Sequence, residues 1–132
     1  TNTLGAIART SSTHRNDLTI VGNWTITGEA SSNTFGINTV LNKVGRTTGW
    51  SQGKVTASCV DVNVSGTTIT QLCQTVVSAT VGAGDSGSDV FAITGGTNVT
   101  LAGVLWGGSG SHTFVFSPLA NVKQELGALT TH

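Results

Sequence analysis

Residues 79–91 read "ATVGAGDSGSDVF" and decide most of what can be expected of this chain of 132 residues. The run places one serine between glycines, with an aspartate directly before it. Glycine allows tight backbone turns, and N–H groups aimed at one point stabilise the oxyanion that forms when a hydroxyl attacks a carbonyl. Ser86 is therefore a candidate nucleophile, with the amides of Gly84 and Ser86 as oxyanion donors. On its own, the run is equally compatible with a plain Gly/Ser/Asp turn.

The composition narrows the possible partners. Charged residues make up 9% of the chain and the net charge is zero, so bulk charge attracts neither nucleic acid nor an anionic membrane. The longest apolar runs, such as "LAGVLWGG", are far shorter than the ~20 residues of a membrane span. Abundant Gly, Thr, Ser, Asn and Val are typical of all-β, often secreted chains, and no signal peptide is visible. We expect a mature extracellular protein that binds no cofactor.

Short strand-like runs recur between turn residues and predict an all-β fold. They cover residues 18–22, 24–28, 53–64, 67–77, 89–94, 99–106 and 111–117. One helix is predicted at the C-terminus, with Ser117 as N-cap and Pro118 at the first helical position. Its apolar face holds Leu119, Val122 and Leu126, and Gly127 ends it. Many strands with one final helix favour a β-barrel or sandwich.

The two cysteines, Cys59 and Cys73, flank a turn near residues 65–66 and would face each other on neighbouring strands. Their spacing does not match a zinc site, and we expect no metal. A disulfide is predicted, with free buried thiols as the alternative. Closing a loop of this size contributes about 3 kcal/mol in the chain-entropy model.

Four motifs in a fixed order carry a resemblance to a known family. They are "VGRTTGWSQGKV" (44–55), "GDSGSDVF" (84–91), "LAGVLWGGSG" (101–110) and "FSPLANVKQEL" (116–126). Together they resemble the C-terminal β-barrel of chymotrypsin-fold serine proteases, in particular streptogrisin-like, bacterial secreted members, over about residues 40–129. The resemblance implies an antiparallel six-stranded Greek-key barrel with a C-terminal helix at 41–132. Residues 1–40 would be a remnant of the first barrel and a linker.

The resemblance also implies roles for single residues. Ser86 becomes the nucleophile of a serine hydrolase, Gly84 and Ser86 form the oxyanion hole, and Asp85 anchors the loop through an ion pair with Arg46. A buried carboxylate beside Ser86 needs such a charged partner. The alternative for Arg46 is a surface residue in a turn.

A peptide or ester substrate is expected to bind between residues 79–84 and 105–108. The strand edge at Gly107 and Gly108 would pair with a peptide through main-chain hydrogen bonds. An uncharged Thr80 implies a small or apolar substrate side chain rather than Lys or Arg. The substrate-binding candidates are Thr80, Ala83, Leu105, Trp106, Gly107 and Gly108.

The family's general base His and its partner Asp belong to the N-terminal barrel, which this chain is expected to lack. We therefore expect weak esterase or peptidase activity at most, and Asp89 departs from the proline usual after the nucleophile motif. His14, near Asp17, is the speculative base; His112 and His132 are weaker candidates.

An apolar barrel face without its usual cover invites association. The missing N-terminal barrel or a second copy of the chain, in a homo-oligomer, is therefore an expected partner. The alternative function is a non-catalytic β-barrel module that binds a ligand or only contributes structure.

Overall fold

The structure is a computed structural model that describes residues 25–32, 34–64, 66, 68–96 and 98–127. The predicted strand at 18–22, His14 and His132 lie outside these residues. The elements are β1 (Thr25–Glu29), β2 (Val40–Gly45), β3 (Gly49–Asn63), β4 (Thr70–Ser78), β5 (Asp89–Gly95), β6 (Asn98–Gly108), β7 (Phe114–Pro118) and α2 (Leu119–Leu126).

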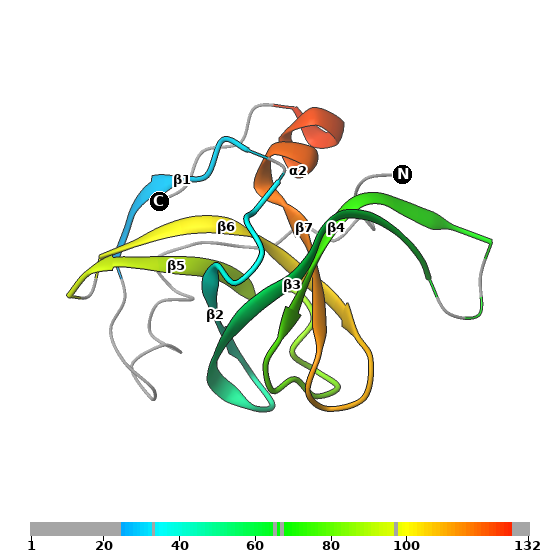
Figure 1. The fold of residues 1–132 in the computed structure, drawn as a ribbon, viewed down its shortest axis with the longest axis horizontal. Coiled ribbons are helices and arrows are strands. Elements are labelled where there is room, and N and C mark those ends of the chain that lie inside the picture. The colour runs from blue at the N-terminus through cyan, green and yellow to red at the C-terminus, as the bar shows by residue number, and fades with distance from the viewer. Residues whose placement is uncertain (1–24, 33, 65, 67, 97, 128–132) are drawn as a thin grey trace.

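The strands form a barrel that closes on itself. Their order is β1-β6-β5-β2-β3-β4-β7, and a further pairing joins β7 back to β6. All pairings in the ring from β6 through β5, β2, β3, β4 and β7 are antiparallel. This ring confirms the predicted antiparallel barrel with its C-terminal helix. In Figure 1 the β3–β4 hairpin extends beyond the barrel as a long arm, and α2 lies at the opposite end from the β2–β3 turn.

The barrel interior is the main hydrophobic core. Because successive side chains of a strand point to opposite faces, alternate apolar residues of the strands meet inside the ring. The buried core residues are Leu41, Val55, Val77, Ala79, Val81, Val90, Ala102, Leu105, Phe114 and Phe116. Phe35, from the segment before β2, packs edge-on against Phe116 with ring centroids 5.4 Å apart. A smaller cluster of Phe91, Val99, Ile26 and Val44 lies apart from this core.

β1 adds a strand to the barrel, in parallel to β6, with Thr25 opposite Asn98. The amide of Ala30 continues this contact by donating to the Leu101 carbonyl at 2.8 Å. An ion pair between Lys123 of α2 and Glu29 of β1, 2.5 Å long, ties the strand to the helix. Part of the segment before residue 40 is thus bound to the barrel itself.

β2 is the strand that sequence reasoning missed. Its sequence, "VLNKVG", does not alternate between apolar and polar residues, and three consecutive side chains, Leu41, Asn42 and Lys43, are buried. Two polar side chains at 1% and 0% exposure contradict the usual inference that Asn and Lys mark a loop or surface. They are buried because other parts of the fold supply partners for them.

The C-terminal helix corrects one predicted cap. Ser117 belongs to β7, and its hydroxyl donates to Gln74 Oε1 at 2.7 Å instead of capping a helix. Pro118 occupies the N-cap position, without a side-chain cap. Gly127 ends the helix at φ 85°, its amide donating to the Lys123 carbonyl. Within the described residues, no helix is long and apolar enough to cross a membrane.

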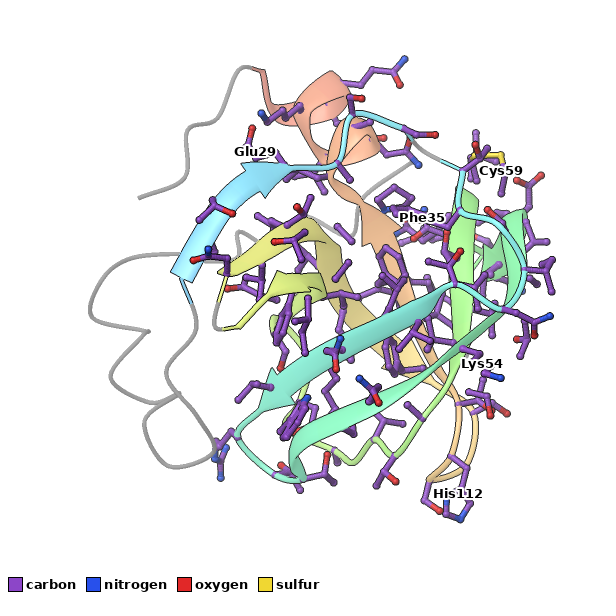
Figure 2. All side chains as sticks on the ribbon, turned by 60° about the vertical axis from the view of Figure 1, so that its left-hand side comes forward. Glu29, Phe35, Lys54, Cys59 and His112 are labelled. Atoms are coloured by element: carbon purple, nitrogen blue, oxygen red, sulfur yellow. A yellow bond between two sulfur atoms is a disulfide. The ribbon has the colours of Figure 1, made fainter. Side chains whose placement is uncertain are left out.

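A disulfide joins Cys59 of β3 to Cys73 of β4, as predicted. The bond lies in the part of the hairpin that extends from the barrel, near Cys59 in Figure 2. It crosslinks two adjacent antiparallel strands and so closes the hairpin loop between two residues 14 positions apart. Disulfides of this kind persist in oxidising compartments.

Candidate active site

The segment from Ala79 to Ser88 connects β4 to β5 and is called the nucleophile loop below. It contains two successive turns: the amide of Asp85 donates to the Gly82 carbonyl, and the amide of Ser88 donates to the Asp85 carbonyl, both at 3.1 Å. The two turns share the buried Asp85, and Ser86, inside the second turn, is exposed. The base of the loop is joined to β6 by hydrogen bonds between Ser88 and Leu105 and between Gly87 and Leu105.

Asp85 is fully buried, and both oxygens of its carboxylate accept hydrogen bonds. Its Oδ2 meets Lys43 Nζ at 3.0 Å, the Thr48 hydroxyl at 2.5 Å and the Gly82 amide at 3.0 Å. Its Oδ1 accepts from the amides of Thr47 at 2.8 Å and Thr48 at 3.2 Å. Burial alone would raise the pKa of Asp85, but these hydrogen bonds outweigh burial and hold the pKa well below its ordinary value. The carboxyl is therefore a permanent anion that fastens the loop to the β2–β3 turn.

Lys43 is the cation that meets Asp85, and Arg46 is not. Lys43 is fully buried, and its ammonium also donates to the Gly49 carbonyl at 3.0 Å and to the Thr48 hydroxyl. Arg46 lies in the turn between β2 and β3, is exposed, and makes no ion pair or hydrogen bond to any described residue. The expected Arg46–Asp85 pair is thus wrong in its cation, because β2 directs Lys43 into the barrel while the turn directs Arg46 outward.

Two glycines make this close contact possible. A Cβ on Gly45 would stand 2.2 Å from Asp85 Oδ1, which no side chain could tolerate. Gly84 has φ 99°, and a Cβ there would stand 2.5 Å from the Thr47 hydroxyl. Glycine is required at both positions, at Gly45 by close approach and at Gly84 by backbone conformation as well.

The Ser86 hydroxyl donates to the backbone carbonyl of Trp106 at 3.2 Å. His112, the histidine that the described residues contain, is exposed at the tip of the loop between β6 and β7 (Figure 2) and makes no hydrogen bond to Ser86. The amides of Gly84 and Ser86 donate to no acceptor within the described part of the chain. The Ser86 hydroxyl is thus bonded within the chain, whereas the two amides are without an acceptor among the described residues.

The predicted substrate-binding residues divide into two groups. Ala83 and Gly108 are exposed, and a Cβ on Gly107 would meet nothing within 4 Å, so the surface beside β6 is open there. Val81 fills part of the space between the two predicted segments, because its Cγ1 lies 3.0 Å from the Cβ position of Gly108. The exposed Thr80 accepts the Ser51 hydroxyl on its carbonyl at 2.7 Å.

Two other candidates are engaged elsewhere. Leu105 is 1% exposed in the barrel core, and its amide and carbonyl already bond to Ser88 and Gly87. It therefore has no free group for a substrate, which corrects the expected role. The indole N–H of Trp106 donates to Gln74 Oε1 at 2.7 Å, so this half-buried ring is held against β4.

Asp89 opens β5 three residues beyond Ser86. Its side chain makes no hydrogen bond or ion pair with a described residue. Its neighbour Val90 points into the core, so Asp89 faces the outside of the barrel. Burial raises the pKa of Asp89 to about 7, because the charged form loses water and gains no partner.

Comparison with known proteins finds structural similarity only. No protein-family model and no curated protein sequence matches the chain. Among solved structures, Cellulomonas bogoriensis chymotrypsin matches with a TM-score of 0.66 and 24% identity over 84% of this chain and 58% of that one. Thermobifida fusca protease A matches at 0.67 and 26%, over 84% and 57%. Nocardiopsis protease matches at 0.61 and 26%, over 79% and 52%.

These neighbours define the class of fold. The described chain has the fold of bacterial chymotrypsin-type serine proteases. It spans between 52% and 58% of the length of these three neighbours.

Proposed function

We propose that this chain supplies the nucleophile and the oxyanion donors of a chymotrypsin-type serine hydrolase. The observation that carries the proposal is an exposed Ser86 on a loop fixed from below by the fully buried Asp85. Preorganisation of this kind is what acyl transfer requires, because donors that are already in place need no rearrangement when charge develops. A loop that served only as a connection would not need a saturated buried ion pair beneath its apex.

In the proposed reaction, Ser86 Oγ attacks the substrate carbonyl carbon and its proton passes to a general base. The amides of Gly84 and Ser86 bind the oxygen that becomes negative. The Trp106 carbonyl that now accepts the Ser86 hydroxyl is too weakly basic to take the proton, so the base comes from beyond the described residues. His14, a first barrel or a second copy of the chain are the candidates. Without a base, a residual rate of about 10^3–10^4 over water is the most that the remaining groups provide.

The proposed substrate is a peptide or an ester that lies along the open surface at Gly107 and Gly108. Main-chain pairing with this strand would orient the acyl group toward Ser86. Thr80 places no carboxylate beside the site, so a Lys or Arg side chain is not favoured there. The disulfide and the bacterial structural neighbours support an extracellular location for this activity.

A second function, a non-catalytic binding or structural module, is favoured by one observation. The Ser86 hydroxyl is bonded to a backbone carbonyl, and no described imidazole contacts it. In that case the barrel would keep the shape of the nucleophile loop but would not catalyse acyl transfer.

A fluorophosphonate probe separates the two functions. The proposed hydrolase is labelled at Ser86, and Ser86→Ala abolishes labelling. Ser109→Ala, at an exposed serine after β6, is the matched control and keeps it. Labelling of heat-denatured protein should be absent, which shows that the fold activates the hydroxyl. Absence of labelling of the native protein at millimolar probe would establish the non-catalytic module.

A further inference from the structure

Arg46 carries a charge that the fold does not use. Asp85, in the loop that the turn of Arg46 contacts, already accepts four hydrogen bonds and is neutralised by an ion pair with Lys43. Arg46 is exposed and has no partner within the described residues. Because a guanidinium keeps its charge at all ordinary pH values, this side chain is a standing positive group on the surface.

The place of this charge is fixed by the turn that carries it. Thr47, the next residue, donates its hydroxyl to the Ala83 carbonyl at 2.5 Å and its amide to Asp85 Oδ1 at 2.8 Å. The turn is thereby fastened to the nucleophile loop. Arg46 Nη1 lies 3.8 Å from the point that a Cβ on Gly84 would occupy. The guanidinium therefore lies directly beside Gly84, one of the two proposed oxyanion donors.

Among the described residues, no acidic group forms an ion pair with Arg46. The amides of Gly84 and Ser86 have no internal acceptor within the described residues, and the guanidinium adds planar donors that match a carboxylate in geometry. The charge of Asp85 is below the surface and is cancelled by Lys43. An anionic group that approaches Ser86 meets attraction from Arg46, whereas a cationic group meets repulsion.

We infer that Arg46 is a substrate-binding residue that selects acyl substrates with a carboxylate beside the reacting carbonyl. In a peptide, this is an Asp or Glu side chain next to the bond that Ser86 attacks. The inference rests on the proposed function for the position of the substrate. Arg46 takes no part in the chemical step. It determines which substrate binds beside Ser86.

The test compares two fluorophosphonate probes that are identical except for a terminal carboxylate or carboxamide. In the wild-type chain, the second-order rate constant of Ser86 labelling should be about twofold to fivefold higher for the carboxylate probe, the range of an exposed ion pair. Arg46→Gln should bring this ratio to about one, and Arg46→Glu should invert it. Raising the salt concentration should reduce the wild-type ratio, because exposed charges are screened.

Lys54→Gln is the matched control, since Lys54 is an exposed cation on β3 away from the turn (Figure 2). It changes the net charge equally and should leave the ratio unchanged. The same ratio in wild type and in both Arg46 variants would overturn the inference.

A second measurement separates failure of the inference from failure of the proposed function. Titration with sodium succinate, followed by amide NMR, should shift the Gly84 and Ser86 signals in the wild-type chain and leave them unmoved in Arg46→Gln. If no probe labels Ser86, the proposed hydrolase fails, but these shifts would still support an anion site made by Arg46. If Ser86 is labelled and succinate moves neither signal, the hydrolase stands and the role of Arg46 is wrong.

Discussion

Asp85 and Asp89 are two carboxyls four residues apart whose surroundings give them opposite properties. Asp85 is fully buried, yet its pKa is lowered, because Lys43, Thr48 and two further backbone amides donate to it. Asp89 is less buried by surface area, yet its pKa is raised to about 7, because nothing described donates to it. Burial raises a carboxyl pKa in both cases, and the supply of donors decides the outcome.

The opposite pKa shifts show that Asp85 stabilises the candidate site, whereas Asp89 is partly buried without a stabilising partner among the described residues. Asp85 is surrounded by groups from β2, the β2–β3 turn and its own loop, all within the barrel, so the loop needs no outside group to hold it. Asp89 faces outward, where a partner that covers this face could supply a donor. Four substitutions test this contrast, from the largest expected effect to the smallest.

Replacing Lys43 by Met should destabilise the protein by about 3–5 kcal/mol, because Asp85 would remain buried without its cation. Urea denaturation followed by fluorescence measures the change in the free energy of unfolding. The double variant Lys43→Met with Asp85→Asn removes both charges and should regain part of the loss. If Lys43→Met alone cost less than about 1 kcal/mol, the pair would not be the anchor described here.

Replacing Gly45 by Ala should cost about 1–3 kcal/mol, because the new methyl group would overlap the Asp85 carboxylate and force the loop to shift. Gly95→Ala is the control: it also lies in a strand, and a Cβ there would meet nothing within 4 Å. Thermal unfolding of the two variants should differ by several degrees. Equal melting temperatures would mean that Gly45 is not needed for close approach.

Replacing Asp89 by Asn should stabilise the protein above pH 7 by about 1–2 kcal/mol and leave it unchanged below pH 4. The folded-state pKa of about 7 exceeds the ordinary aspartate value of 3.8, so the folded chain binds more protons between these values and stability falls as pH rises. Part of the ~1.4 kcal/mol per pKa unit is absent because the carboxyl keeps some water. Asp85 acts in the opposite sense: its stabilisation is lost as pH falls below about 4.

The measurement for Asp89 is the free energy of unfolding from pH 4 to pH 8 for the wild type and Asp89→Asn. A parallel profile for Asp89→Asn would show that Asp89 is already charged in the folded state at neutral pH.

Replacing Lys123 by Met should cost only about 0.2–1 kcal/mol. This lysine also forms an ion pair, to Glu29, but both side chains keep about a third of their exposure, 33% and 28%, so water replaces much of the lost attraction. Both variants replace an ion-paired lysine by methionine. The difference between their losses in the free energy of unfolding therefore measures how much burial strengthens an ion pair. A loss as large as that of Lys43→Met would mean that β1 depends on this contact.

The sequence predicted those parts of the fold that follow from local pattern. Alternating apolar residues and turn glycines identified most strands, and the two cysteines lay symmetrically about a turn, which predicted the disulfide. The strand β2 was missed because Asn42 and Lys43 are polar, and their burial depends on partners distant in sequence. Ser117 was assigned to a helix cap for a similar reason: its hydroxyl bonds to Gln74, 43 positions away.

At the candidate site, the motif around Ser86 identified the loop but not what holds it. The family resemblance implies both that Asp85 anchors the loop and that Arg46, in "VGRTTGWSQGKV", is its cation. The available signal for Lys43 was a lysine just before this motif, flanked by Val40, Leu41 and Val44. This signal identifies Lys43 as the partner of Asp85 only when it is known that β2 is a strand and that the Lys43 side chain points inward.

By itself, the sequence pattern determined an all-β fold, two cysteines opposite each other on neighbouring strands and a serine among glycines, because strand period, turn chemistry and glycine freedom act over a few residues. The closed barrel was implied by the family resemblance and not by this local pattern. Only the tertiary structure decided which cation neutralises Asp85, which amides near Ser86 are without an acceptor among the described residues, and that Arg46 is exposed. These depend on the direction of side chains from strands far apart in the chain. A hydrogen bond requires its two atoms to come within about 3 Å, and only the closed barrel brings them there.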